Sequence, residues 1–486
     1  MVSPAIQSST GKSAHIAIVG GGLAGLAAGC ALADAGCRIS LYEKRPYLGG
    51  RASSYQHPGT GEVVDNCQHV LLGCCTNLID LYRRTGVEDK IRWYSELVFL
   101  EPGGRASRIH PSFLPAPLHT GPSFLNAACL GFKDKFSIAR TLGALLTGVP
   151  ADDGQTFLAW LQGYGPTPAA LERFWKPILI SALNEDLDRV SVFYAGQVIR
   201  ESFMKSAEAG RMGIPAVPLS DLYAAGADYI RARGGEVFLR ASVEELSVED
   251  SVVRLKTGLS EVATDAVVVA APWDATQKLL AGVAEMDTPE VPGGQGGRHH
   301  VDIGELESSP IAGIHLWFDR QISDLDHAVL LDRTIQWMFH KSRIQSAIRG
   351  SAEARNGSYV ELVVSAAKSL VNMSKSDIVD LAVRELGEFF PQVREAKLLK
   401  STVIKEIHAT FSPGPGVDQF RPNQATASSR VFVAGDWTAT GWPATMEGAV
   451  RSGYLAAEAV ARGANLDRTA FLRVDLPPRG LMRLFE

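Results

Sequence analysis

The sequence predicts an α/β protein whose core is a parallel sheet, with an α+β domain inserted into it. The first observation is an apolar strand at residues 15–19 that runs into a glycine-rich turn and an Ala- and Leu-rich helix. The second is a strand over residues 431–436 that ends in Gly-Asp. The third is a helix followed by three strands over residues 219–271. Apolar strands separated by helices are typical of a buried parallel sheet, because parallel neighbours need crossover connections.

The composition is that of a globular protein with more than one domain. The chain has 486 residues, of which 46% are hydrophobic and 21% are charged. A chain of this length normally divides its core between two or more domains. Its 48 Lys and Arg residues against 53 Asp and Glu residues give a net charge of -5. There is no basic excess to neutralise phosphates, so we expect no nucleic-acid partner.

The cysteines and the N-terminal segment indicate a cellular location. All six cysteines precede residue 130, two of them are adjacent, and no CxxC occurs. This spacing excludes a zinc or disulfide framework, so we expect no metal site and reduced thiols. The apolar stretch near the N-terminus is broken by glycines and fits neither a signal peptide nor a spanning helix. We therefore expect a cytoplasmic protein, or one that lies peripherally on the inner face of a membrane.

The first strand opens a dinucleotide-binding fingerprint. Residues 20–25 fit the pattern GxGxxG directly after the strand at residues 15–19. Gly20 permits the tight turn, Gly22 lets backbone N–H groups approach a pyrophosphate, and Gly25 lets the helix pack on the sheet. The N-terminus of that helix offers partial positive charge to the phosphates. The residues predicted to bind here are Gly20, Gly22, Leu23, Ala24 and Gly25.

The second strand, at residues 39–42, ends in an acid. Glu43 follows Gly25 by 18 residues and is placed to accept hydrogen bonds from both ribose hydroxyls. Lys44 comes next and completes this part of the predicted cofactor site. An acid at this position disfavours a 2′-phosphate and argues against NADP. The fingerprint by itself leaves NAD and FAD open.

Two further segments carry a family resemblance. Leu48-Gly49-Gly50-Arg51 lies just past the acid, and Ala434-Gly435-Asp436 ends the C-terminal strand. Together they resemble the GGR and AGD motifs of the flavin amine oxidase and carotenoid desaturase superfamily, where both motifs serve FAD. The resemblance implies a Rossmann-like FAD-binding domain of the glutathione-reductase type. It places Gly50 and Arg51 near the pyrophosphate, and Gly435 and Asp436 near the ribityl or phosphate region.

The last predicted helix begins within the segment Thr445-Met446-Glu447 and runs to residue 462. Thr445 is a suitable N-cap. In the resembling family the N-terminus of this helix points at the flavin pyrimidine, where its N–H groups stabilise the charge that builds on reduction. Val243 occupies the position of the family's adenine contact. No attachment motif accompanies the nearby nucleophiles, so we expect FAD to be noncovalent.

These elements divide the chain into discontinuous parts. We predict an FAD-binding domain formed by residues 1–85, 213–285 and 400–470, a substrate and lipid-binding domain formed by residues 86–212 and 286–399, and a C-terminal tail of residues 471–486.

Residues 111–149 form an unusual apolar tract. Aromatic residues and leucines alternate there with prolines, and Lys133, Lys135 and Arg140 flank them. One interpretation is a patch that dips into a membrane interface while the cations meet anionic headgroups. The other is an ordinary segment of core and loop. The tract also resembles the region through which carotenoid desaturases admit lipids.

The segment Val64–Gly73 indicates one branch of the superfamily. It contains Gln68-His69 and, with the apolar tract, resembles the hydroxysqualene dehydroxylases of bacterial hopanoid and carotenoid pathways. Cys67 departs from the glycine that this branch often has. The resemblance implies removal of the hydroxyl group of hydroxysqualene to give squalene, with hydride from N5 of reduced flavin. It also implies a C30 isoprenoid substrate in a long apolar tunnel.

This chemistry needs a proton donor, because hydroxide is a poor leaving group. His69 is the candidate donor since imidazole titrates near neutral pH, and Gln68 is a candidate for orienting the hydroxyl or the flavin edge. A structural role for His69 is the competing interpretation. The sequence leaves open which tryptophans line the cavity; the candidates are Trp175, Trp317, Trp337 and Trp442.

Three alternatives remain at this stage. An oxidative carotenoid desaturase of the phytoene type and a flavin amine oxidase share the FAD motifs and differ in the direction of hydride flow. A prenyl-binding protein without catalysis shares the architecture. The intact glycines, with Glu43 and Asp436, argue against that third alternative.

Overall fold

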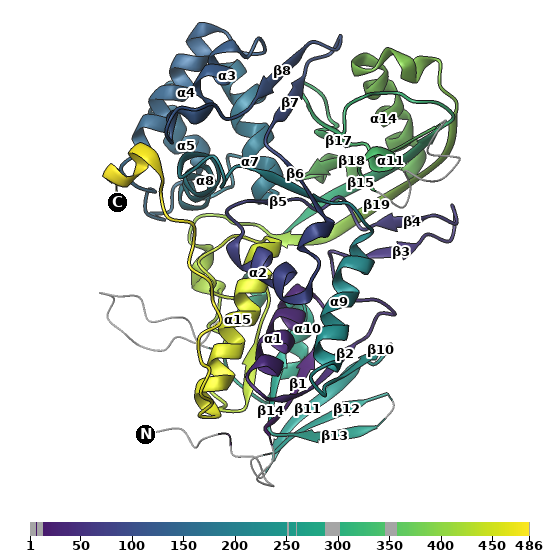
Figure 1. The fold of residues 1–486 in the computed structure, drawn as a ribbon, viewed down its shortest axis with the longest axis vertical. Helices are drawn as coiled ribbons and strands as arrows, with labels where there is room; N and C mark the ends of the chain where they lie inside the picture. The colour runs from purple at the N-terminus through teal and green to yellow at the C-terminus, as the bar shows by residue number, and fades with distance from the viewer. Residues whose placement is uncertain are drawn as a thin grey trace.

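The computed structural model describes residues 6, 13–249, 252–258, 260–286, 302–345 and 357–485 (Figure 1). A five-stranded parallel sheet occupies the lower half of the molecule in Figure 1 and has the order β10-β2-β1-β14-β20. Its strands are β1 (His15–Val19), β2 (Arg38–Glu43), β10 (Glu236–Leu239), β14 (Ala266–Val269) and β20 (Val431–Val433). They come from three separate stretches of the chain.

The parallel sheet is the middle of three layers. Because side chains alternate along a strand, Ile16 and Ile18 face the helices while Ala17 and Val19 face the other layer. The helices are α1 (Leu23–Asp34), α2 (Thr76–Thr85), α9 (Leu219–Arg231) and α15 (Met446–Gly463). The other layer holds β11 (Val243–Glu249), β12 (Val252–Thr257), β13 (Glu261–Thr264) and α10 (Trp273–Leu280). The predicted α/β fold class is confirmed.

A seven-stranded sheet lies in the upper half of Figure 1, in the order β19-β15-β18-β17-β16-β7-β8. Its strands are β7 (Leu97–Leu100), β8 (Ala106–Ile109), β15 (Ser308–Phe318), β16 (His327–Leu330), β17 (Trp337–Phe339), β18 (Ser358–Ser365) and β19 (Leu398–Phe411). Helix α14 (Lys375–Phe389) packs on one face. The opposite, inner face carries the alternate side chains of β15 and β18, among them His315 and Glu361, which are register partners.

The rest of the upper half, beside the seven-stranded sheet, consists mainly of helices. They are α3 (Gly121–Asn126), α4 (Phe132–Ala144), α5 (Phe157–Gln162), α6 (Pro168–Ala170), α7 (Lys176–Leu183) and α8 (Val192–Ile199), and α11 (Lys341–Ile344) follows β17.

Two small sheets connect the halves: β3 (Ser54–Gln56) with β4 (Val63–Asp65), and β5 (Leu71–Leu72) with β9 (Met212–Pro215) and β6 (Ile91–Tyr94).

The C-terminal tail runs from the lower half to the upper half (Figure 1). The backbone N–H groups of Phe471 and Leu472 donate to Glu458 of α15, and the N–H of Leu481 donates to Ala116 O at 2.8 Å. The tail therefore straps the two halves together. The exact division into domains stays a prediction.

Candidate cofactor and active site

Two glycine loops form a cradle at the carboxyl ends of β1 and β2. The N–H of Gly49 donates to Gly21 O at 2.9 Å, and a Cβ placed on Gly22 would meet only the Cα of Gly50, at 3.8 Å. Gly22 is the N-cap of α1, no side chain caps the helix, and no acid lies in its first turn. Leu23 and Ala24 begin the helix with buried side chains, so they offer their backbone N–H groups. This end of α1 is open to an anionic group.

Other glycines of the motif are required for packing. A Cβ at Gly25 would lie 2.0 Å from Gly20 O, and one at Gly20, where φ is +110°, would lie 2.4 Å from Ala270 O. The turn and the contact between α1 and the sheet therefore depend on the absence of these side chains.

Glu43 is buried at the end of β2. Its carboxylate accepts from the N–H groups of Gly21 and Arg45, each at 2.7 Å, which fixes it beside the cradle. The N–H of Ala241 donates to Glu43 O at 2.9 Å and so brings Val243, the first residue of β11, to the same edge. The side chain of Lys44 is exposed and makes no contact with the cradle that the structure records.

Arg51 and Asp436 meet although 385 residues separate them. Arg51 Nη2 lies 2.5 Å from Asp436 Oδ1, and Arg51 Nη1 donates to Ala409 O at 2.6 Å. Gly435, next to the pair, donates its N–H to Ser452 Oγ of α15 at 2.9 Å. The two predicted motifs therefore face one another across the cradle.

Arg421 holds the loop between β20 and α15, and sequence reasoning missed it. It is fully buried and donates to the backbone oxygens of Asp436, Thr438 and Trp442 at 3.1, 2.7 and 2.8 Å. This arginine sets the path by which the chain reaches the N-terminus of α15. A fully buried arginine cannot be inferred from a loop sequence, because its partners are carbonyl groups.

The three residues predicted at the start of α15 have different surroundings. Thr445 is the N-cap and accepts from Gly448 N at 3.0 Å, and Met446 Sδ accepts from Tyr223 Oη at 3.4 Å. Glu447 points to α2 instead, where it accepts from Asn77 N and Leu78 N at 3.2 and 2.8 Å. Its side chain therefore caps α2 and is not free to contact a cofactor, and burial raises its pKa. The side chain turns this way because α2 lies beside α15, and a cofactor contact through the backbone N–H of Glu447 stays a prediction.

Comparison with known proteins shows the family of the chain. A family model described as flavin containing amine oxidoreductase matches residues 23–461. The chain belongs to this family.

Curated proteins similar to the oxidoreductase include carotenoid desaturases. The 15-cis-phytoene desaturase of Synechococcus elongatus is 29% identical over 475 residues, which cover 92% of this chain and 95% of that protein. The 15-cis-phytoene desaturase of Arabidopsis thaliana is 28% identical over 481 residues, covering 92% of this chain and 80% of that protein.

Solved structures share the fold. An oxidoreductase from Methanosarcina mazei has a TM-score of 0.68 and 18% identity, and covers 90% of this chain and 98% of its own. Cyclohexylamine oxidase from Brevibacterium oxydans has a TM-score of 0.60 and 17% identity, and covers 93% of this chain and 99% of its own.

The oxidoreductase is FAD-dependent, and its cradle fits the cofactor. The uncapped N-terminus of α1 and the space that a Gly22 side chain would fill suit the pyrophosphate, and the fixed Glu43 carboxylate suits ribose hydroxyls. Arg45, a second residue that sequence reasoning missed, donates to Gly50 O at 3.0 Å and adds positive charge at the same edge. The sequence could have indicated Arg45, because it follows Glu43 by two residues.

The predicted catalytic residues lie on the loop between β4 and β5. Asn66 Nδ2 donates to Arg51 O at 3.0 Å, which anchors this loop beside the cradle. Cys67 has φ +64°, a conformation that glycine adopts more readily. His69 is half-buried with Nδ1 2.9 Å from Cys67 O, and Gln68 Nε2 donates to His69 O at 2.9 Å.

The protonation state of His69 follows from this geometry. A carbonyl only accepts, so Nδ1 carries the proton and Nε2 is left as an acceptor in the neutral ring. Burial lowers the pKa of His69 below its ordinary 6.5. His69 is therefore mainly neutral at pH 7, and only a small fraction of it is protonated at that pH.

A buried polar cluster lies under this loop, and sequence reasoning missed it. Lys341 Nζ lies 2.5 Å from Asp65 Oδ2, 2.8 Å from Gln68 Oε1 and 3.2 Å from Glu361 Oε2. His315 Nε2 lies 3.9 Å from Glu361 Oε1, and neither atom has a hydrogen-bond partner. All of these groups except Gln68 are fully or almost fully buried. For two of these residues a signal was available, because His315 and Glu361 are polar residues inside otherwise apolar strands.

Burial and mutual charge set the pKa values of the cluster. Burial raises the pKa of Glu361 to about 8, although Lys341 opposes the shift, and burial lowers that of His315 to about 3. Burial opposes the charges of Lys341 and Asp65, but their attraction outweighs it, so the pKa of Lys341 is raised and that of Asp65 lowered. At neutral pH the cluster therefore holds one ammonium, one carboxylate, a protonated Glu361 and a neutral His315.

The candidate cavity tryptophans separate into two groups. Trp317 and Trp337 lie on the strands of the seven-stranded sheet, and each stacks on a second ring, Tyr359 and Phe339, with centroids 4.4 and 5.5 Å apart. Trp175 is fully buried in the hydrophobic core against Phe157, and Trp442 is buried in the core around α1. Trp317 and Trp337 therefore stay candidates for the wall of a substrate cavity.

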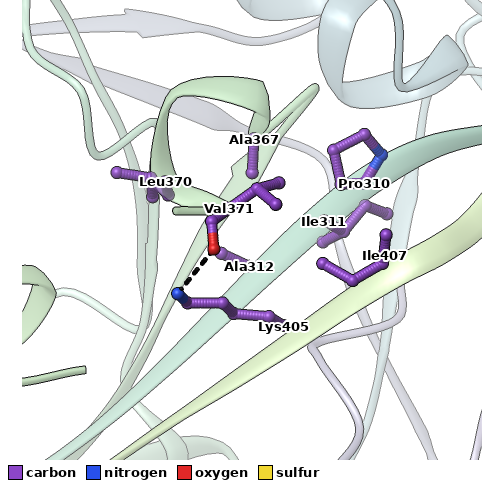
Figure 2. A pocket seen from close by; sticks show the side chains of 8 residues that line it. All are labelled: Pro310, Ile311, Ala312, Ala367, Leu370, Val371, Lys405 and Ile407. Atoms are coloured by element: carbon purple, nitrogen blue, oxygen red, sulfur yellow. Dashed lines mark hydrogen bonds between the residues drawn. The ribbon is translucent and has the colours of Figure 1, made fainter. Parts of the chain in front are cut away.

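Figure 2 shows a separate hollow beside β15 and β19. It is lined by Pro310, Ile311, Ala312, Ala367, Leu370, Val371, Lys405 and Ile407, and Lys405 Nζ donates to Val371 O at 2.9 Å. It has no interior room for a water molecule. This hollow is therefore no substrate site.

The cradle predicts a difference between two glycine variants. Gly22→Ala should fold normally but lower FAD affinity by about tenfold or more, because the methyl group occupies pyrophosphate space and one lost tight contact costs about 1.4 kcal/mol. Fluorescence titration of the apoprotein with FAD and thermal unfolding of the same apoprotein measure the two effects. Gly25→Ala is the matched control and should lower the unfolding temperature instead. Unchanged FAD affinity in Gly22→Ala would contradict the assignment.

Glu361 predicts a pH dependence of stability. Its pKa is about 8 in the folded chain and ordinarily near 4.5, so the folded state binds the extra proton between these values. Stability therefore falls as pH rises through that window. Glu361→Gln should flatten the fall and gain on the order of 2 kcal/mol at pH 8, where the wild-type chain retains a buried acid. Thermal unfolding from pH 5 to 9 measures this, with Glu385→Gln, a buried acid behind the sheet, as the control.

Proposed function

We propose that the oxidoreductase removes the hydroxyl group of hydroxysqualene to give squalene, a reaction of hopanoid and isoprenoid biosynthesis. The observation that carries the proposal is the loop beside the cofactor cradle, where Gln68 keeps an amide N–H to donate and His69 keeps a ring nitrogen to accept. Long polyisoprenes as substrates agree with the relatives, which are named for phytoene. An allylic alcohol needs polar groups at one carbon and apolar contact along the rest.

The balance of the reaction is R–OH + FADH₂ → R–H + H₂O + FAD. FAD supplies hydride when bound and reduced. Gln68 retains one amide N–H beyond its bond to His69 O, which can donate to the departing oxygen. His69 Nε2 can accept from the hydroxyl of the substrate and orient it, and in its protonated form it can donate to that oxygen. Apolar side chains around a bound substrate would exclude water from the developing allylic cation.

An oxidative phytoene-type desaturase is the second candidate. The named relatives favour it, at 28–29% identity over most of the chain. The two candidates share the cradle and the apolar walls and differ in hydride direction. A flavin amine oxidase is less well supported, because the likeness to cyclohexylamine oxidase is one of fold. A prenyl-binding role without catalysis is not favoured, since the chain keeps the FAD cradle and belongs to an oxidoreductase family.

One anaerobic experiment separates these functions. The photoreduced holoenzyme, mixed with hydroxysqualene, should become reoxidised and yield about one squalene per flavin. The oxidised holoenzyme should be inert with phytoene and with amines. Inertness of the reduced form toward hydroxysqualene, with turnover of phytoene by the oxidised form, would reverse the assignment.

His69 predicts a pH profile for the same assay. The single-turnover rate should rise as pH falls through a value below 6.5, because only the protonated ring donates to the leaving oxygen. His69→Gln should lose this rise and about 10²-fold in rate. His119→Gln is the control, because burial lowers the pKa of this histidine as well and it lies away from the loop. A wild-type rate that does not change between pH 5 and 7 would exclude His69 as donor.

We also propose that the apolar tract contacts a membrane surface. The aromatic side chains of Phe113, Phe132 and Phe136 are 95%, 83% and 65% exposed. Leu481 and Leu484 of the tail are also exposed, and the tail bonds to Ala116 within the tract. Lys133 is exposed on the same helix as Phe132. Apolar side chains flanked by cations suit an interface with anionic lipid. In the described part of the chain, no helix has both the length and the apolar character needed to cross a membrane.

Loss of two aromatic side chains should weaken this contact. Phe113→Ser combined with Phe132→Ser should reduce binding to phosphatidylglycerol vesicles about tenfold or more, since burying one such ring stabilises by roughly 1.5–3 kcal/mol. Vesicle flotation measures it. Val474→Ser removes an exposed apolar side chain outside the tract and should leave flotation unchanged. Equal flotation of all three proteins would contradict a membrane role.

A further inference from the structure

The buried cluster of Asp65, Lys341, Glu361 and His315 is not used by the reaction as written. Four titratable side chains are buried together, and apolar side chains in their place would avoid the free-energy cost of desolvation. The cluster joins two parts of the fold. Asp65 ends β4, beside the cofactor cradle, whereas Glu361 and His315 belong to the inner face of the seven-stranded sheet. Lys341 lies between them.

We propose that Lys341 is a positioning residue that holds the Gln68 amide by its hydrogen bond to Gln68 Oε1, a contact that we call the clamp, and that ionisation of Glu361 breaks this contact. The inference rests on the proposed function only in assigning Gln68 a contact with the substrate. The clamp itself consists of contacts between described side chains.

Lys341 determines which way the amide of Gln68 faces. An ammonium group only donates, so the atom 2.8 Å from Lys341 Nζ must be the amide oxygen. The NH₂ group consequently points the other way, to His69 O at 2.9 Å, and keeps one N–H for another acceptor. Without Lys341 the amide would lose this constraint. The same loop also carries His69, so the clamp fixes both candidate catalytic side chains.

Asp65 keeps Lys341 charged and in place. Its carboxylate also accepts from Ser54 Oγ at 2.5 Å, from Leu219 N at 3.2 Å and from Gln345 Nε2 at 3.3 Å. It is thus fully hydrogen-bonded, with contacts from β3, α9 and α11. Asp65 is the permanent partner of the ammonium.

Glu361 is the variable partner. Among the described residues its nearest charged partner is Lys341, at 3.2 Å, and its Oε1 and the facing His315 Nε2 lack hydrogen bonds. A protonated Glu361 leaves the ammonium to Asp65 and Gln68. An ionised Glu361 attracts the ammonium in a site of low dielectric, in competition with the uncharged Gln68. The cluster then gains a net negative charge.

Among the described residues, no lysine or arginine other than Lys341 is in contact with Glu361. The neighbours on the packed elements are His315 on β15, Tyr359 on β18, Cys67 on the loop and Glu406 on β19, with His57 near His315 and Glu62 near Tyr359. Burial keeps His315 neutral and raises the pKa values of Cys67 and Tyr359. Glu406 accepts from Asn66 Nδ2 at 3.1 Å. Lys341 is therefore the one cation of the described cluster, and its partition between Glu361 and Gln68 decides whether the loop is held.

Hydrogen exchange of the holoenzyme tests the clamp directly. The measurement compares protection of the peptide that covers residues 66–72 at pH 7 and pH 9, corrected for the intrinsic pH dependence of exchange. We expect wild-type protection to fall several-fold at pH 9. Glu361→Gln, which cannot ionise, should keep high protection at both values. Gln68→Met should show low protection at both, because no amide remains to be held.

Glu385→Gln serves as a matched control, since Glu385 is a buried acid that accepts from Ile335 N at 2.9 Å behind the same sheet. It should behave as wild type. Equal loss of protection in the wild type and in Glu361→Gln, or no loss in the wild type, overturns the proposal. Lys341→Arg, which conserves the charge, should retain protection at pH 7 even if its geometry differs.

Turnover of hydroxysqualene separates this inference from the proposed function. If both hold, kcat/KM falls between pH 7 and 9 in both proteins as His69 loses its proton, but it falls several-fold further in the wild type than in Glu361→Gln. If the holoenzyme is inert toward hydroxysqualene while the exchange pattern is as expected, the function fails and the clamp stands. If turnover occurs but exchange is insensitive to Glu361, the clamp fails and the function stands.

Discussion

The architecture depends on the pairing of β14 with two strands from opposite ends of the chain. β14 lies between β1 and β20 in the parallel sheet, so the first and last parts of the polypeptide must meet there. That meeting is close: a Cβ on Gly453 of α15 would lie 2.2 Å from Ala24 O of α1. Only with this packing do Arg51 and Asp436 come within an ion-pair distance. The cofactor cradle is thus a consequence of sheet order.

A second constraint acts between the two sheets. The β3–β4 hairpin and the loop after it leave the cradle and reach the inner face of the seven-stranded sheet, where Asp65 meets Lys341. Taking these charges out of water is expensive, and only the network of partners around Asp65 and Lys341 offsets that cost. The loop that carries Gln68 and His69 is therefore held at its start, by Arg51 O through Asn66, and at its middle, by Lys341 through Gln68.

Sequence reasoning predicted the parts of the site that local geometry determines. The glycines at positions 20, 22 and 25 and the acid at 43 have roles that follow from one strand, one turn and one helix, and the structure places them together. Features that depend on tertiary neighbours were missed or misplaced. The side chain of Glu447 caps α2, which the sequence did not predict, because nothing local shows which helix lies beside it. Lys341 and Glu361 become partners only through the register of β17, β18 and the short helix after β17.

The position of the polar cluster bears on the choice between reduction and desaturation. Removal of hydrogen from a hydrocarbon needs a flavin and apolar walls, and a buried ammonium beneath those walls would add only a desolvation cost. Departure of the hydroxyl group as water, by contrast, needs a proton donor and also a hydrogen-bond donor held in one orientation, in a site that excludes bulk water. An amide whose oxygen is fixed by Lys341 is such a donor, and it is not titrated at physiological pH. The cost of the cluster is therefore easier to understand for an oxygen-bearing substrate than for a plain polyene.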